Sequence, residues 1–256
     1  YAGIQKFVAF IMSVHIAEVM QIFFCIVTGI PVMRTPLQIL FLILVTDLPP
    51  SIALGMEPGE KTILKERPRP RTEPVVLNWM WVSMCLNGLL LSAVIIAVYL
   101  GSLVYFCDGA ILQTDIDMVK DRDTKLMQAR TVAFIALVWS ENVRSYTSRS
   151  FDKPVWRDIF GNRHMQKAIF LAQVCLYAAV LIPFFSDEIL GLSGVSIGGQ
   201  GWAIALLGPL GCLVLCEASK PITGYQMRRY QQWLAVQQAS GDEGMRKAGK
   251  DGCKVG

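Results

Sequence analysis

Long apolar segments, separated by charged or Gly/Pro-rich connections, are the feature that most limits how this chain can fold. A helix that crosses the hydrocarbon core of a bilayer needs about 20 predominantly apolar residues. Six segments come near that length, and they cover residues 7–30, 36–56, 79–106, 131–147, 168–185 and 202–222. We therefore predict an all-α, polytopic membrane helical bundle with six transmembrane helices.

The composition supports this fold class. Hydrophobic residues make up 53% of the 256 residues and charged residues only 17%, whereas an average soluble domain is about 25% charged. No basic stripe with interleaved aromatic residues indicates nucleic-acid binding. We predict a transmembrane domain over 1–222, followed by a basic cytoplasmic tail over 223–256 that starts as a helix and is otherwise largely disordered.

Basic residues indicate the orientation of the bundle. They gather in connection 57–78, in connection 148–167 and in the tail after 223, whereas the opposite side carries Arg34 and the mixed-charge loop 107–130. Because cytoplasmic connections of membrane proteins are enriched in Lys and Arg, the first group and both termini are predicted to be cytoplasmic. The net charge of +4 is then a consequence of topology.

Few ionisable side chains lie inside the apolar segments. Each costs about 2.5–3.5 kcal/mol or more at mid-bilayer, so such groups usually face the bundle interior and mark an ion path. His15 and Glu18 are three residues apart on one helix face, and Glu141 precedes Asn142 near mid-depth of the fourth segment. These residues could instead only join helices by hydrogen bonds. Glu217, near the end of the last segment, is expected to pair with a nearby lysine.

The second segment contains Val45-Thr46-Asp47-Leu48-Pro49-Pro50. Each proline removes a backbone donor and clashes with the preceding turn, so we expect the helix to unwind at Asp47–Pro50 and to free carbonyls. Irregular backbone inside a membrane is tolerated only where protein or a polar cavity covers it. The oxygens of these carbonyls, Thr46 and Asp47 suit hard cations such as Ca²⁺ or Na⁺. Carboxylates from three helices could converge on one cation, and their mutual repulsion would favour proton uptake when it leaves.

Four stretches of the chain resemble type II P-type cation-transporting ATPases. Residues 44–55 resemble the sixth membrane helix of that family, with its LVTDxxPAxALG pattern, and residues 65–74 resemble the cytoplasmic loop that follows it. Residues 13–19 are similar to the SSNxxEV pattern of the fifth helix, and residues 129–131 open a segment as the eighth helix does. The resemblance covers the whole chain except the tail.

The resemblance implies a fold and a function. The six segments would be helices five to ten of a ten-helix pump, and Glu18, Thr46, Asp47 and Glu141 would bind the transported Ca²⁺ or Na⁺, with Asn142 behind them. Partners would be the lipid bilayer, helices one to four, and the actuator, nucleotide-binding and phosphorylation domains, where Mg²⁺ and ATP act. The pump would lie in the plasma membrane or an endomembrane. The DKTG phosphorylation motif does not occur in these 256 residues, so this segment alone would not hydrolyse ATP.

Two departures from the family pattern bear on the ion. His15 and Ile43 stand where the calcium pumps carry asparagines, and an isoleucine cannot coordinate a cation. We therefore expect one transported cation per cycle. His15 could carry a proton in counter-transport, because imidazole titrates near neutral pH, or could only pack and hydrogen-bond. The four retained residues favour Ca²⁺, whereas the two departures fit Na⁺ or Na⁺/H⁺ exchange nearly as well.

Two alternatives remain open from the sequence. The chain could be a free-standing six-helix cation channel or secondary transporter. It could also be a truncated relative of a pump that acts as a membrane-bound regulatory partner and binds no ion itself.

Overall fold

The computed structural model describes residues 2–56, 75–119, 121–149, 155 and 161–252. This part of the chain is helical and contains no strand, which confirms the predicted all-α bundle. In chain order the helical elements are α1 (Ala2–Thr28), α2 (Pro36–Phe41), η1 (Leu42–Asp47), α3 (Leu48–Gly55), α4 (Asn78–Phe106), α5 (Gln113–Ile116), α6 (Arg122–Thr147), α7 (Arg163–Leu181), η4 (Phe184–Leu190) and α8 (Gly198–Gly252).

Five helical stretches of the described chain are long and apolar enough to cross a membrane. They cover Gly3–Thr28, Pro36–Gly55, Asn78–Phe106, Arg163–Leu181 and Gly198–Trp233. These agree with five of the six predicted segments. α6 is not among them, because Glu141, Asn142 and Arg144 lower its apolar character, and its crossing of the membrane stays a prediction.

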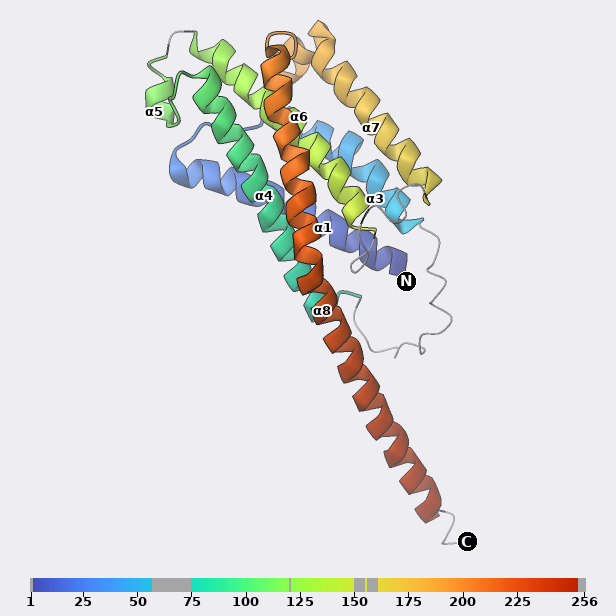
Figure 1. Cartoon of the computed structure of the whole chain (residues 1–256). Coiled ribbons are helices and arrows are strands. Elements are labelled where there is room, and N and C mark those ends of the chain that lie inside the picture. The colour runs from blue at the N-terminus through green and yellow to red at the C-terminus, as the bar shows by residue number, and fades with distance from the viewer. Residues whose placement is uncertain (1, 57–74, 120, 150–154, 156–160, 253–256) are drawn as a thin grey trace.

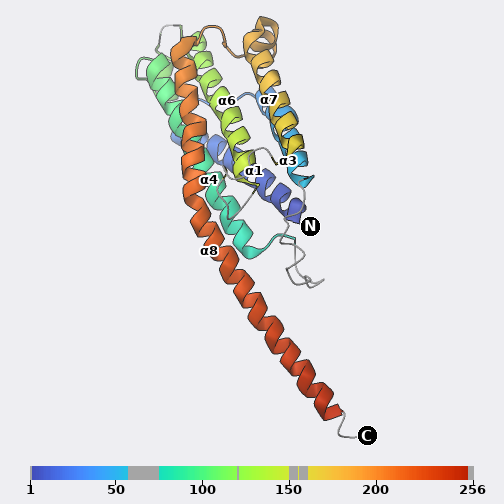
Figure 2. The same cartoon turned by 45° about the vertical axis from the view of Figure 1, so that its right-hand side comes forward.

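α6 lies at the centre of the bundle. Figures 1 and 2 show it between α8 and α4 on one side and α3 and α7 on the other, and it packs against all four. Seven consecutive side chains, from Val132 to Val138, are buried. A helix buried all round faces protein on every side, so α6 can carry polar groups that a lipid-facing helix could not.

Glycines allow the helices to approach closely. A Cβ added at Gly208 of α8 would lie 2.9 Å from the Ala136 Cβ of α6, and one at Gly88 of α4 would lie 2.8 Å from the Ser13 carbonyl oxygen of α1. Small residues at such crossings are typical of membrane bundles, where close backbone packing drives association.

The proline-containing helix is not unwound, and that detail of the prediction is wrong. Over Leu42–Asp47 the chain forms the π-helix η1, and α3 follows directly from Leu48. The Leu48 N–H bonds to the Ile43 carbonyl five residues back, which is the wider π-helical spacing. Pro49 and Pro50 then fall in the first turn of α3, where a missing N–H is tolerated. The wider turn therefore accommodates the prolines without loss of helix.

The last helix extends beyond the predicted membrane domain. α8 has 55 residues and continues to Gly252, so the tail expected to be disordered is helical to that residue. Figure 1 shows this end projecting away from the bundle. The domain boundary at residue 222 stays a prediction. The basic connection used to predict orientation lies mostly in 57–74, outside the described residues.

Candidate functional site

α1 contributes the first pair of polar side chains to the candidate site. The Nδ1 atom of His15 lies 3.0 Å from Oε2 of Glu18, as their spacing of three residues on one helix face predicted. Glu18 is buried, whereas the His15 side chain is 42% exposed. The pair therefore lies at the edge of the site, with the carboxylate directed inward.

Arg34 contacts the candidate site, and the sequence did not predict this contact. It lies in the short connection between α1 and α2, and it is buried. Its Nη1 atom donates to Oε1 of Glu18 at 3.3 Å, and its Nη2 atom donates to Oε1 of Gln21 at 2.6 Å. The distribution of basic residues assigns Arg34 only to the side opposite the basic connections. A signal was available, because the arginine directly precedes the helix-starting Thr35-Pro36 and so must lie close to the membrane segments.

The π-helix and α6 contribute the second group. The Thr46 hydroxyl donates to Oε2 of Glu141 at 3.2 Å and to the Leu42 carbonyl oxygen of its own helix at 2.8 Å. Asp47, next to Thr46, is 4% exposed, and Glu141 is 1% exposed. η1 thus directs the Thr46 hydroxyl toward α6 and buries the adjacent Asp47 carboxylate.

Several oxygens of this second group lack a hydrogen-bond partner among the described residues. They are both carboxylate oxygens of Asp47, Oε1 of Glu141 and the side-chain oxygen of Asn142. A buried polar atom without a partner is costly, and each such atom in a native structure calls for a ligand, a water or a further chain. The unpartnered oxygens therefore lie where a bound cation would satisfy them.

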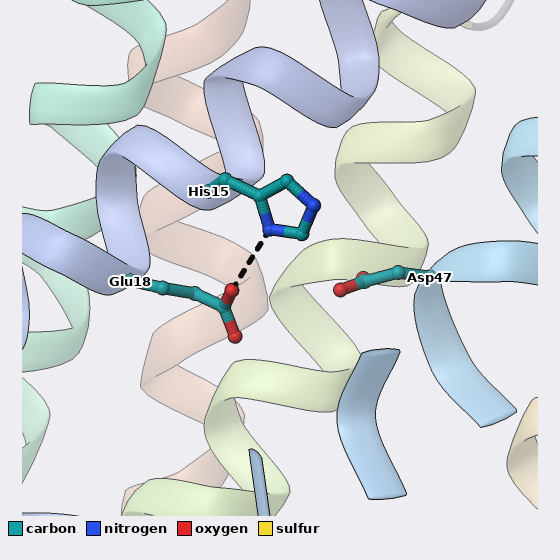
Figure 3. A group of neighbouring side chains, drawn as sticks. All are labelled: His15, Glu18 and Asp47. Carbon is teal, nitrogen blue, oxygen red and sulfur yellow. Dashed lines mark hydrogen bonds and ion pairs between the residues drawn. The ribbon is translucent and has the colours of Figure 1, made fainter. Parts of the chain in front are cut away.

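The two groups meet across the helices. One ligand atom each of His15, Glu18 and Asp47 lie within 4.8 Å of one another. Figure 3 shows the carboxylates of Glu18 and Asp47 extending toward each other from different helices, with His15 bonded to Glu18. Carboxylate, hydroxyl and amide oxygens are the ligands that hard cations prefer. The arrangement can hold a dehydrated cation between α1 and η1, and Thr46 of η1 joins Glu141 of α6 to this group.

Two other residues behave as their sequence context indicated. Glu217 of α8 pairs with Lys220 at 2.7 Å, which confirms the expected lysine-paired carboxylate. Ile43 of η1 is 37% exposed and presents no ligand atom, so it adds nothing to the cation-binding atoms.

Comparison with known proteins identifies the family. The profile of the family described as "Cation transporting ATPase, C-terminus" matches residues 31–222. A calcium-transporting ATPase of Bacillus cereus is 27% identical over 222 residues, which are 86% of this chain and 24% of that protein. The endoplasmic reticulum calcium ATPase of Aspergillus fumigatus is 26% identical over 205 residues, 72% of this chain and 20% of that protein. A P-type sodium-transporting ATPase of Plasmodium falciparum is 34% identical over 109 residues, 43% of this chain and 9% of that protein.

The chain spans at most about a quarter of the length of these relatives. The matches do not favour a free-standing channel or secondary transporter, because the helices from α2 into α8 lie within the matched region. The bundle, its buried carboxylates and the family match agree: the chain belongs to the P-type cation-transporting ATPases and forms the C-terminal membrane region of such a pump.

Proposed function

We propose that this region binds the transported cation, Ca²⁺ or Na⁺, through Glu18, Thr46, Asp47 and Glu141. The observation that carries the proposal is the set of buried, unpartnered oxygens on Asp47 and Glu141. A bound cation would accept these lone pairs and offset the charge of the carboxylates, which a membrane interior otherwise disfavours. Asn142, beside Glu141, would add an amide oxygen or hold Glu141 in place.

ATP would drive the transport through parts of the pump that lie outside this chain. We propose that cytoplasmic domains bind ATP and Mg²⁺, and that four further helices complete the membrane part. Exposure at the site supports the second point: His15 and Ile43, both at mid-segment, are partly uncovered within the described chain. Further helices of the pump would cover this side. Both termini would then be cytoplasmic, as the distribution of basic residues indicates.

His15 gives the site a group that can exchange protons. Its imidazole contacts the carboxylate of Glu18, which is one of the proposed cation ligands. A protonated imidazole and a cation bound to Glu18 would repel each other, so binding of one would disfavour binding of the other. This supports proton counter-transport as part of the proposed function.

The test is the ATPase activity of the full-length pump, measured while Ca²⁺, Na⁺, K⁺ and pH are varied separately. We expect Ca²⁺ or Na⁺ to activate hydrolysis at micromolar to millimolar concentration, and Asp47→Asn to abolish that activation. Hydrolysis that none of these cations stimulates, or stimulation that persists in Asp47→Asn, would contradict the proposed site.

A further inference from the structure

The buried guanidinium of Arg34 is the group at this site that the proposed function leaves unexplained. A pump that binds a cation has no evident use for a permanent positive charge among its ligands, because like charges repel. The guanidinium of Arg34 remains charged at any accessible pH, so Arg34 cannot avoid this repulsion by losing a proton. Arg34 nevertheless lies 3.3 Å from Glu18, with a side chain that is 2% exposed.

Arg34 and His15 together occupy both carboxylate oxygens of Glu18. Oε1 accepts from the guanidinium at 3.3 Å, and Oε2 lies 3.0 Å from the imidazole. In contrast, both oxygens of Asp47 and one oxygen of Glu141 have no partner in the described chain. The predicted ligands therefore divide into a paired carboxylate on α1 and unpaired carboxylates on η1 and α6.

The connection that carries Arg34 is firmly anchored. Tyr99 of α4 donates its hydroxyl to the Pro31 carbonyl at 2.9 Å, and Arg130 of α6 donates to the Val32 carbonyl at 2.9 Å. On the other side of Arg34, Thr35 caps α2 in a reciprocal pair of hydrogen bonds with Gln38. The guanidinium is thus held beside Glu18 by backbone fixed on both sides, in addition to its own bond to Gln21.

The charge of Arg34 changes how much positive charge the site must take up to become neutral. The three buried carboxylates carry three negative charges when ionised, and the guanidinium offsets one of them. The two charges that remain equal the charge of one divalent cation. Without the guanidinium, the site would need a further positive charge from solution to reach neutrality in a low-dielectric interior.

We propose that Arg34 is a resident cation of the site, which neutralises Glu18 and thereby limits uptake from solution to two positive charges, one divalent cation. Arg34 is a specificity-determining residue in this scheme, and the cation is bound mainly by Asp47, Glu141 and Thr46. The inference rests on the proposed function, because it assigns charge capacity to that same site.

The experiment is equilibrium binding of radiolabelled Ca²⁺ and Na⁺ to the purified full-length pump without ATP. We expect one Ca²⁺ per polypeptide in the wild type and no Na⁺ bound beside it. In Arg34→Gln we expect one additional Na⁺ at saturating Ca²⁺, or Ca²⁺ affinity higher by about tenfold, because a repulsive charge is removed. Arg34→Lys keeps the charge and should retain the wild-type stoichiometry.

Arg122→Gln is the matched control, because it removes an exposed arginine that pairs with Asp117 and Asp123 and contacts neither the connection that carries Arg34 nor a carboxylate of the site. It should bind cations as the wild type does. If Arg34→Gln does not fold, Arg34→Met replaces it, since an apolar side chain of similar length suits a buried membrane position.

The outcomes separate this inference from the proposed function. Unchanged stoichiometry and affinity in Arg34→Gln or Arg34→Met, or two Ca²⁺ in the wild type, would overturn the role of Arg34 while leaving the cation site in place. A change in Arg34→Lys equal to that in Arg34→Gln would also overturn it, because charge would not be the cause. A wild-type pump that binds neither cation would contradict the proposed function itself.

Discussion

The hydroxyl of Thr46 donates to Oε2 of Glu141 at 3.2 Å, across 95 residues of sequence. This bond joins the π-helix η1 to the central helix α6. It leaves Oε1 of Glu141 without a partner in the described chain. Thr46 therefore orients the carboxylate of Glu141, which we propose as a cation ligand.

Replacing Thr46 by valine removes this donor while keeping the shape of the side chain. We expect the cation affinity of the full-length pump to fall by about tenfold, because a buried acceptor that loses its hydrogen bond costs on the order of 1–3 kcal/mol. The measurement is the half-activating cation concentration for ATP hydrolysis. Thr28→Val is the matched control, since the Thr28 hydroxyl bonds to backbone carbonyls of α1 and lies away from the carboxylates. Equal effects of the two variants would contradict a site role for Thr46.

Neutralising the unpaired carboxylates should remove cation binding. We expect Glu141→Gln to lose activation by the transported cation, because Glu141 supplies a buried, unpartnered oxygen at the site. Glu217→Gln is the control: this carboxylate also lies in an apolar helix, but Lys220 pairs with it at 2.7 Å. It should retain wild-type activation by the cation in the same ATPase assay. Loss of activation in Glu217→Gln, with retention in Glu141→Gln, would reverse our assignment.

Much of the fold followed from the sequence, because the length of an apolar segment and the bilayer thickness determine each other. Six segments were predicted on that ground alone, and five of them coincide with helices long and apolar enough to cross a membrane. α6 shows the limit of the rule. Its central position permits Glu141 and Asn142, and these same residues lower its hydropathy below that of a lipid-facing helix. Only the packing of the other helices around it shows why it can carry them.

The residues of the proposed site came from the sequence, and their membership of a cation site stays a prediction. A spacing of three residues was enough to place His15 against Glu18. The ion pair between Arg34 and Glu18 could not be predicted from the sequence, because it depends on how the connection after α1 folds back onto that helix. The proline pair indicated a disturbed helix, but whether backbone unwinds or widens into a π-turn is decided by packing around it.

Ile43 leads to a prediction about stoichiometry. It stands on η1 one turn before Thr46 and Asp47, is partly exposed, and has no atom that binds a cation. We expect the full-length pump to move one cation for each ATP hydrolysed. The measurement is simultaneous uptake and phosphate release in sealed vesicles. A ratio of two cations per ATP would show that Ile43 does not mark the loss of a second position.

His15→Asn tests the proton role. A protonated imidazole adds positive charge beside Glu18 and should weaken cation binding as pH falls. We expect the loss of cation affinity, as the pH falls through the titration range of the imidazole, to be smaller in His15→Asn than in the wild type. His164→Asn, which changes the other histidine of the chain at the start of α7, should leave the profile unchanged. A profile identical in all three proteins would remove the proton role and leave a packing role.

Gly88 tests whether α1 is held in place by its crossing with α4. A Cβ at Gly88 would lie 2.8 Å from the Ser13 carbonyl oxygen and 2.9 Å from Cγ2 of Ile16, so α1 must move to admit it. We expect Gly88→Ala to lower the free energy of unfolding by about 1–3 kcal/mol, as overpacking does. Since His15 and Glu18 lie on the same stretch of α1, cation affinity should fall as well. Gly101→Ala, on the same helix with no neighbour within 4 Å of its added Cβ, should be neutral or stabilising because alanine favours helix. Thermal unfolding of the detergent-solubilised full-length pump measures both variants, and equal unfolding temperatures would show that α1 is positioned by other contacts.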